Sequence, residues 1–300
     1  GVWMEIWSEL TIPLNKRDGF FSMIGKSVNP INFDNNKELL LYVPLQFWFC
    51  RNIGLALPLV AIQSQEVRIN LILRDSKELI ISSNGSLIEN SPNKDSINII
   101  EGNLEVDYIF LEEDERKIFS KNNLQYLLTQ VQVSAKSLDT KNFSNQIIDF
   151  TFNHLVSELI WVIQNGNVLD KYSYGGNEWF NFSTESYKNG ESNGTDPMLE
   201  GKILLEGNDL IDTKDYKYFR TVVPYQRHTN VLNNYIYIYS FSLKPEDYQP
   251  SGSCNFSRID NSVLQMKLSE DLKNPIIQIF AVNYNILNIS NGMAGVEYSN

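Results

Sequence analysis

The stretch YIYIYSFSL, residues 235–243, decides the fold class of this chain. Successive side chains of a strand point to opposite faces, and here both faces are at least partly apolar. One face carries Tyr235, Tyr237, Tyr239, Phe241 and Leu243, and the other begins with Ile236 and Ile238. The pattern predicts a strand that is covered on both sides, in a sheet that packs on a core and also on a neighbouring domain or subunit.

Further segments of strand character fill the chain from about residue 120 onward. They are LQYLLTQVQVSA (124–135), QIIDFTF (146–152), ELIWVIQN (158–165), KILLEG (202–207), YFRTVVPY (218–225), SVLQMKL (262–268) and IIQIFAVNYNIL (276–287). A loop rich in Gly, Asn, Ser and Tyr spans 166–200. Roughly eight short strands with turn signals and almost no helix predict a β-sandwich or jelly roll.

The first part of the chain has a different organisation. Trp3, Ile6, Trp7 and Leu10 form one apolar stripe at helical spacing, and Pro13 ends that helix. Residues 13–37 are predicted to be a loop. Strands are predicted over 39–49, 67–73 and 104–110, with a structured loop at 51–58. These strands are too few to close a sandwich of their own.

The run EEDERK at 112–117 predicts a short helix that links the two parts. Its acidic residues stand in the first turn, where the helix dipole favours them. A pair of carboxylates at this place is also the pattern of an acid/base site. Acidic residues at the start of a connecting helix account for the run EEDERK without a catalytic role.

Length and charge exclude several classes of protein. A chain of 300 residues predicts about two domains. The net charge of −11 argues against a nucleic-acid-binding protein and against docking on anionic lipid. No apolar run is long enough for a transmembrane helix, and the start Gly1-Val2-Trp3 carries no secretory signal pattern.

Cysteine and histidine are too scarce for most catalytic or metal chemistry. Cys50 and Cys254 are expected to be buried reduced thiols, with a disulfide between them as the alternative. His154 is expected to be partly buried, and His228 to lie in a loop or an interface. Nucleophile-elbow, zinc and P-loop motifs are all missing. The sequence therefore predicts no enzyme, no cofactor and no metal site.

Five segments closely resemble the major capsid proteins of nucleocytoplasmic large DNA viruses. They are LYVPLQFWFCRNIGLALPLVAIQSQEVRI (41–69), DYIFLEEDERKIF (107–119), FNHLVSELIWVIQN (152–165), YIYSFSLKPEDYQPSGSCNFSRIDN (237–261) and NYNILNISNGMAGVEYSN (283–300). They occur in the family's order and span most of residues 38–300. One departure is visible, because Ser64-Gln65 stands where the family commonly has Tyr-His.

The resemblance implies an all-β fold of two consecutive jelly rolls with few short helices. Residues 1–119 would be the C-terminal part of a first, incomplete jelly roll with its connector helix, and residues 120–300 would be the second. The absent N-terminal stretch of the first jelly roll would leave open sheet edges.

The resemblance also implies a role and a setting. Three chains would form a homotrimeric capsomer, and capsomers with minor capsid proteins would tile an icosahedral shell. That shell would overlie an internal membrane, make no direct contact with nucleic acid, and be assembled in the host cytoplasm. The loop at 166–200 would face outward. Asn181 and Asn193 in this loop are weak glycosylation candidates.

A contact between subunits is one interpretation of the segment PEDYQPSGSCNFSRID at 245–260. Phe256 and Arg258 would be its anchors, since aromatic residues and Arg concentrate at interface cores. A rigid structural turn is the other interpretation.

Two other functions remain as alternatives. A jelly-roll carbohydrate-binding module would use exposed aromatic platforms at Tyr172, Tyr174 and Trp179. A cupin-like metalloenzyme would need a cluster of His and Glu ligands, and two histidines supply too few imidazoles.

Overall fold

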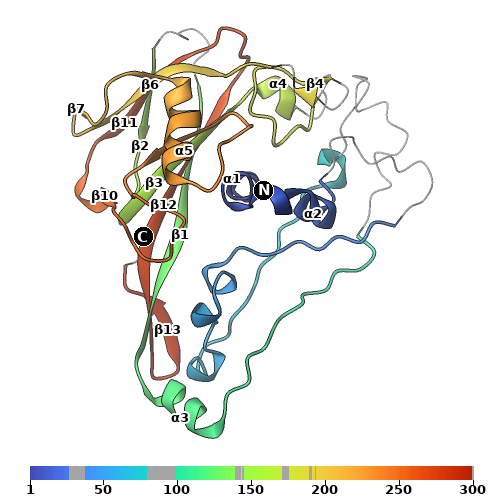
Figure 1. Cartoon of the computed structure of the whole chain (residues 1–300), viewed down its shortest axis with the longest axis vertical. Coiled ribbons are helices and arrows are strands. Elements are labelled where there is room, and N and C mark those ends of the chain that lie inside the picture. The colour runs from blue at the N-terminus through green and yellow to red at the C-terminus, as the bar shows by residue number, and fades with distance from the viewer. Residues whose placement is uncertain are drawn as a thin grey trace.

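The computed structural model describes residues 1–26, 38–79, 99–138, 143, 145–170, 176–188, 191–192 and 194–298. Two antiparallel sheets packed face to face form the core of these residues (Figure 1). The extended N-terminal part runs beside this sandwich and returns to it through helix α3 at the lower tip of Figure 1.

The first sheet, sheet A, is built around its longest strands. Its members are β1 (Leu124–Ser137), β3 (Leu155–Gln164), β9 (Ile236–Ser240), β10 (Cys254–Asn255), β12 (Ile276–Ser290) and β13 (Met293–Val296). Strand β12 lies between β1 and β3, and β9 pairs with β3. The last long strand of the chain is therefore central in the sheet.

The second sheet, sheet B, is smaller. It contains β2 (Gln146–Phe150), β6 (Met198–Leu205), β7 (Asn208–Asp209), β8 (Lys214–Asp215) and β11 (Ser262–Leu268), with β11 between β2 and β6. A separate two-stranded ribbon joins β4 (Tyr187–Lys188) to β5 (Glu191–Ser192). Apart from the hairpins β12–β13 and β6–β7, most neighbouring strands in the two large sheets are distant in sequence, as the predicted jelly roll requires.

Alternating side chains of the two sheets meet in the main core. Trp161 and Ile163 of β3 and Tyr237 of β9 contribute from sheet A, and Ile203 and Leu264 from sheet B. Tyr237 and Trp161 are fully buried, with ring centroids 6.1 Å apart. The predicted β-sandwich is confirmed, with strands that run from Leu124 to Val296.

The opposite face of sheet A is covered as well. Helix α1 (Val2–Thr11) places Ile6 and Leu10 against Ile160 of β3 and against Ile236 and Ile238 of β9. The expectation that both faces of this strand are covered is therefore confirmed for Ile236–Ser240, and the cover comes from the same chain. Leu243 lies beyond the end of the strand and is 61% exposed. Figure 1 shows α1 beside the sandwich, next to helix α5 (Val223–Arg227).

The loop predicted over 13–37 is wrong for its first part, because Leu14–Ile24 form a second helix, α2. Residues 27–37 lie outside the described residues. Pro13 stands at the N-cap of α2, and Gly25 ends the helix in the left-handed conformation with φ of 73°. Its Arg17 pairs with buried Glu9 of α1 at 3.3 Å, and Lys26 beyond it pairs with Glu5. These ion pairs compensate the charges of Glu5 and Glu9, the two acids that α1 buries. The apolar stripe at helical spacing did not indicate that acids would be buried beside it.

The segment 218–225 is also helical, where the sequence predicted a strand. A π-helical turn, η6 (Tyr218–Val222), leads directly into α5, and Pro224 lies in the first turn of α5. Phe219 and Val223 are four residues apart and enter different cores, Phe219 the main one and Val223 the one beneath α1. Two short further helices are α4 (Gly166–Leu169) and η7 (Phe256–Arg258).

The strands predicted over 39–49, 67–73 and 104–110 are wrong for the structure of this chain. Residues 39–47, 67–73 and 104–110 run as extended traces in Figure 1 but pair with no strand among the described residues, and Trp48 and Phe49 lie in a 3-10 turn. Their apolar side chains are largely in solvent, with Ile72 and Phe110 each 94% exposed. An alternating pattern favours an extended backbone, but a strand also needs a neighbour that accepts its hydrogen bonds.

Short turns and one helix punctuate this extended part. The structured loop predicted at 51–58 is confirmed, because it contains the turn η2 (Ile53–Leu55) and lies between η1 (Trp48–Cys50) and η3 (Leu59–Ala61). A fourth turn, η4 (Ser76–Glu78), follows later in this part. The predicted connector is helix α3 (Glu113–Lys121), which begins with a capping box of Glu112 and Glu115. No helix among the described residues is long and apolar enough to span a membrane.

Ser64 and Gln65, which stand where the resembling family commonly has Tyr-His, still make local contacts. The backbone N–H of Ser64 donates to the carbonyl of Gly292 at 2.9 Å, and the side-chain oxygen of Gln65 accepts from the N–H of Ala294 at 2.9 Å. The pair thus holds the turn between β12 and β13 without an aromatic ring or an imidazole.

We predict that Ile6→Ala lowers the free energy of unfolding by about 2–5 kcal/mol, because it leaves a cavity under sheet A. Ile6 is fully buried, whereas Leu14 is 68% exposed. The control Leu14→Ala should therefore change stability by less than about 0.5 kcal/mol. Urea unfolding followed by tryptophan fluorescence measures both, and equal effects of the two substitutions would contradict the role of α1.

Candidate functional site

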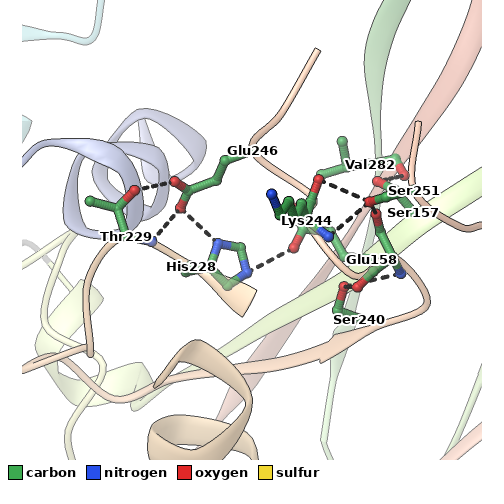
Figure 2. A network of polar contacts seen from close by, with 10 residues as sticks. Ser157, Glu158, His228, Thr229, Ser240, Lys244, Glu246, Ser251 and Val282 are labelled. Carbon is green, nitrogen blue, oxygen red and sulfur yellow. Dashed lines mark hydrogen bonds and ion pairs between the residues drawn. The ribbon is translucent and has the colours of Figure 1, made fainter. Parts of the chain in front are cut away.

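The polar side chains of the described residues form no candidate metal centre. No group of three or more His, Cys, Asp or Glu side chains in this part of the chain could hold a metal ion. The acids of 112–115 lie exposed on α3, where Lys117 pairs with Glu113 at 2.8 Å. The polar arrangement with the most specific geometry is instead centred on His228, just after α5 (Figure 2).

His228 lies between two carboxylates that come from distant parts of the sequence. Its Nε2 is 3.0 Å from Oε2 of Glu158 in β3, and its Nδ1 is 2.9 Å from Oε1 of Glu246 in the loop after β9. The imidazole is 1% exposed. Glu246 also accepts hydrogen bonds from the backbone N–H and the hydroxyl of Thr229 (Figure 2). We call Glu158, His228 and Glu246 the buried triad.

A bulge in β3 aims Glu158 at the histidine. Val282 pairs with Glu158 and Asn283 with Val156, so Ser157 is an extra residue in the ladder. Val156 and Leu159 both face the main core because of this extra residue. Glu158 therefore lies on the outer face of sheet A, the face that Ile160 shares and that α1 and α5 cover.

The triad stabilises the charged form of the imidazole. Burial lowers the pKa of His228, but the charge of Glu158 and its contact with the ring, together with the Glu246 hydrogen bond, raise that pKa to about 9. The same histidine and Thr229 hold the pKa of Glu246 below its usual value, against the effect of burial. At neutral pH His228 is therefore a buried imidazolium beside the Glu246 carboxylate.

Hydroxyl groups close the loop that carries Glu246. The Ser242 and Ser251 hydroxyls are 2.6 Å apart, and the Lys244 N–H donates to Ser251 Oγ at 2.8 Å. Gly252 adopts φ of 146°, and a Cβ there would lie 2.5 Å from the Phe241 carbonyl oxygen. Only glycine fits this close approach, so the loop is fixed at both ends.

Glu178 is a second buried acid, in the loop after α4. Its carboxylate accepts from Asn181 Nδ2 at 2.6 Å and from the Tyr187 N–H at 3.0 Å. Burial raises the pKa of Glu178 to about 7, although both hydrogen bonds act in the opposite direction. This group changes charge close to neutral pH.

The same contacts bear on the glycosylation candidates. Asn181 is 1% exposed, and its amide also donates to the Glu185 carbonyl while its oxygen accepts from Ser183. The amide is therefore inaccessible to a glycan in the folded chain. Asn193 lies outside the described residues.

Trp179 does not form an open sugar platform. Its indole N–H donates to the Glu78 carbonyl at 2.8 Å, and the guanidinium carbon of Arg74 lies 3.8 Å from the ring centroid. Tyr172 and Tyr174 lie outside the described residues. The described residues thus give the carbohydrate-binding alternative no support.

Several other predicted residues have different surroundings from those expected. Cys50 and Cys254 are free thiols, which excludes the disulfide, and Cys50 is exposed rather than buried. His154 is buried, and its backbone N–H donates to Ser257 Oγ at 2.8 Å. Phe256 is 1% exposed and packs with Phe152 and other rings in the main core, so it cannot anchor a subunit contact. Arg258 is exposed.

We predict that the stability contributed by the triad depends on pH. A raised folded-state pKa means that this contribution is fully present below about pH 6.5 and is lost as the pH rises through about 9. The wild-type chain should lose about 3 kcal/mol more than His228→Gln between pH 6 and pH 10. Urea unfolding across this range measures the difference. His154→Asn leaves the triad intact and should follow the wild type.

The contribution of Glu178 to stability should change in a lower pH range than that of His228. Its pKa is also raised, so its contribution is fully present below about pH 4.5 and disappears as the pH rises through about 7. We predict that Glu178→Gln removes this decline, because the amide stays neutral. Thermal unfolding between pH 4.5 and pH 8 tests it, and a variant with the wild-type pH dependence would contradict the assignment.

Two family models match this chain. The model described as the large eukaryotic DNA virus major capsid protein matches residues 115–295, and the major capsid protein N-terminus matches residues 1–112. The major capsid protein of Pyramimonas orientalis virus is 36% identical over 99% of this chain and 72% of its own length. That of Phaeocystis pouchetii virus is 32% identical over 100% of this chain and 78% of its own length.

The fold agrees with these matches. A chain in the quasi-atomic model of the PBCV-1 virus capsid superimposes with a TM-score of 0.68 at 27% identity, over 99% of this chain and 79% of that chain. The superposition supports the jelly-roll fold expected from the resemblance. The family match over more than half of the chain, the identity to curated relatives and the shared fold agree, and the chain belongs to the major capsid proteins of large eukaryotic DNA viruses.

Proposed function

We propose that this structural capsid protein acts as a homotrimer, with each copy contributing its sandwich to one capsomer. The observation that carries the proposal is the rigid sandwich, whose sheet A is covered on both faces and whose loops are fixed by buried polar contacts. A shell subunit needs a body of this kind, because the positions of its surface contacts must not vary between copies.

The division into two jelly rolls, residues 1–119 and 120–300, belongs to the proposal. The two family matches meet near this boundary, at 112 and 115. The extended part carries large exposed apolar side chains at 39–43, 67–73 and 104–110. Apolar area of this extent favours association, so we propose that these residues are covered in the assembled protein.

Charge and composition support a role that depends on contacts between proteins. The net charge of −11 is unfavourable for contact with a nucleic-acid backbone. We therefore propose that the shell makes no direct contact with nucleic acid, overlies an internal membrane, and uses neighbouring capsomers and minor capsid proteins as partners. The proposal includes no catalytic activity, no cofactor, and assembly of the virion shell in the host cytoplasm.

The loop at 166–200 is proposed to face outward. Its described residues, 166–170, 176–188, 191–192 and 194–200, come between β3 of sheet A and β6 of sheet B in the chain, and α4 and β4 among them lie near the top of Figure 1. Loops at the ends of a sandwich are the surfaces that vary and make contacts.

The test is the mass of the purified chain in solution. One chain has a mass of 34.6 kDa, so light scattering on a size-exclusion column should give a value near 104 kDa, three times that mass. A folded chain that remains at 34.6 kDa up to high micromolar concentration would contradict the trimer. Circular dichroism on the same fractions establishes whether the chain is folded.

A further inference from the structure

Glu178 differs from the other buried acids of the described residues because it has no counter-charge. Five acidic side chains are at most 8% exposed, namely Glu5, Glu9, Glu158, Glu178 and Asp196. Four of these five form ion pairs, with Lys26, Arg17, His228 and Arg220 in turn. The carboxylate of Glu178 forms no ion pair within the described part of the chain. It accepts hydrogen bonds from Asn181 Nδ2 at 2.6 Å and from the Tyr187 N–H at 3.0 Å.

The two hydrogen bonds of Glu178 close a loop within the chain. Asn181 lies three positions after Glu178, and Tyr187 is the first residue of β4, so the carboxylate joins both ends of residues 178–187. The backbone N–H of Glu178 also donates to the Val168 carbonyl of α4 at 2.8 Å. We call residues 176–187 the Glu178 segment.

The Glu178 segment is attached to the sandwich by few contacts. Strand β4 pairs only with β5, in a ribbon outside sheets A and B. The main apolar attachment is Phe182, which is 1% exposed and packs in the core beneath α1. Opening of the segment would break this packing and local hydrogen bonds, but no strand pairing of the two large sheets. Segments attached in this way open locally at a lower free energy than core strands.

The groups of α1 that face the segment cannot compensate the charge of Glu178. Burial, followed by the charges of Glu178, Glu5 and Glu9, raises the pKa of Tyr187. The Tyr187 phenol is therefore neutral around pH 7 and adds no positive charge. Glu5 and Glu9 are acids themselves, and the cations beside them are already used in their own ion pairs.

The other neighbours of the segment supply no free cation either. The guanidinium carbon of Arg74 lies 3.8 Å from the Trp179 ring centroid, but Arg74 pairs with Glu78 at 3.0 Å. Helix α4 has no titratable side chain, and the Tyr235 hydroxyl donates to the Gly194 carbonyl. When the carboxyl ionises, its charge is therefore balanced by two hydrogen bonds alone.

We propose that Glu178 makes the Glu178 segment a pH-sensitive latch, which stays closed while the carboxyl is neutral and opens locally, with the sandwich intact, when the carboxyl is charged. An ionised carboxylate without a counter-charge is more stable in water than in a buried site, so ionisation favours the open form. Opening exposes side chains that the closed form buries, Asn181 and Phe182 among them. The inference goes beyond the proposed function and does not depend on the homotrimer.

The linkage between proton binding and opening sets the size of the effect. The pKa of Glu178 is about 7 in the closed form and has its usual value of 4.5 when the side chain is in water. The advantage of the closed form is therefore fully present below pH 4.5 and is lost as the pH rises through about 7. The equilibrium constant for opening should be about 30 times larger at pH 8.5 than at pH 5.5.

Hydrogen exchange of the full chain, followed by mass spectrometry, tests the latch. After division by the intrinsic exchange rate at each pH, peptides of the Glu178 segment should show the rise of about 30-fold. Their opening constants should exceed those of β12 peptides at both pH values. Glu178→Gln stays neutral and should remove the rise. The control Glu185→Gln removes an exposed carboxyl of the same segment and should follow the wild type.

Cleavage by chymotrypsin gives an independent readout at a single pH. Phe182 is 1% exposed in the closed form, whereas Phe110 is 94% exposed. At pH 8.5 the initial rate of cleavage after Phe182 should be at least about tenfold lower in Glu178→Gln than in the wild type. Cleavage after Phe110 should have the same initial rate in both chains. Mass spectrometry identifies the fragments.

The outcomes decide the proposal. An opening constant that rises equally in Glu178→Gln and in the wild type overturns the latch, because other groups would then cause the rise. Exchange of the segment at the rate of β12 also overturns it, because the segment would then open only when the whole chain unfolds. Should circular dichroism show that Glu178→Gln does not fold, the wild type decides alone. The latch then stands only if the segment opens more readily than β12 and its opening constant rises with pH.

Discussion

Sheet A must be buried on both of its faces, and the rest of the structure depends on this constraint. Strands β3 and β9 carry apolar side chains on both sides, with Trp161 and Tyr237 facing sheet B and Ile160 and Ile238 facing outward. One sandwich partner can cover only the first set. The second set requires α1 and α5, and α1 in turn buries Glu5 and Glu9, which need Lys26 and Arg17. The position of the N-terminal helices thus follows from Ile160 and Ile238, which lie more than 140 residues further along the chain.

Buried polar groups then fix the positions of the loops, which apolar packing alone leaves free to vary. The outer face of sheet A accepts Glu158 only because an imidazolium compensates its charge, and that imidazolium orders two loops at once. Removing one member would leave an uncompensated charge in a site that excludes water, so the three residues act together. For a capsid protein this matters more than for a flexible binding protein, because lattice contacts repeat only if each subunit has the same loop geometry.

Sequence patterns predicted the sandwich well and the polar contacts poorly. Alternation in 235–243 indicated a strand covered on both faces, and helical spacing from Trp3 to Leu10 indicated α1; both are local signals. The strands expected at 39–49, 67–73 and 104–110 are extended but unpaired, because alternation reports the preference of one segment and not the presence of a neighbour. The π-helical turn at 218–222 was missed because its β-branched and aromatic residues also suit a strand. No local pattern predicted the triad, because Glu158 lies 70 positions before His228 and Glu246 lies 18 positions after it. The sequence showed only a Glu within an otherwise apolar strand.

The central place of β12 has a consequence for biosynthesis. This strand, Ile276–Ser290, hydrogen-bonds to both β1 and β3, yet it leaves the ribosome after them. Sheet A therefore cannot close before β12 has left the ribosome, and until then the binding site of α1 stays incomplete although α1 itself is already made. Pairings of such large sequence separation form slowly, and the exposed apolar strands of the nascent chain are prone to aggregate. A protein needed in many copies per particle would thus place a heavy demand on the chaperones of the infected cell.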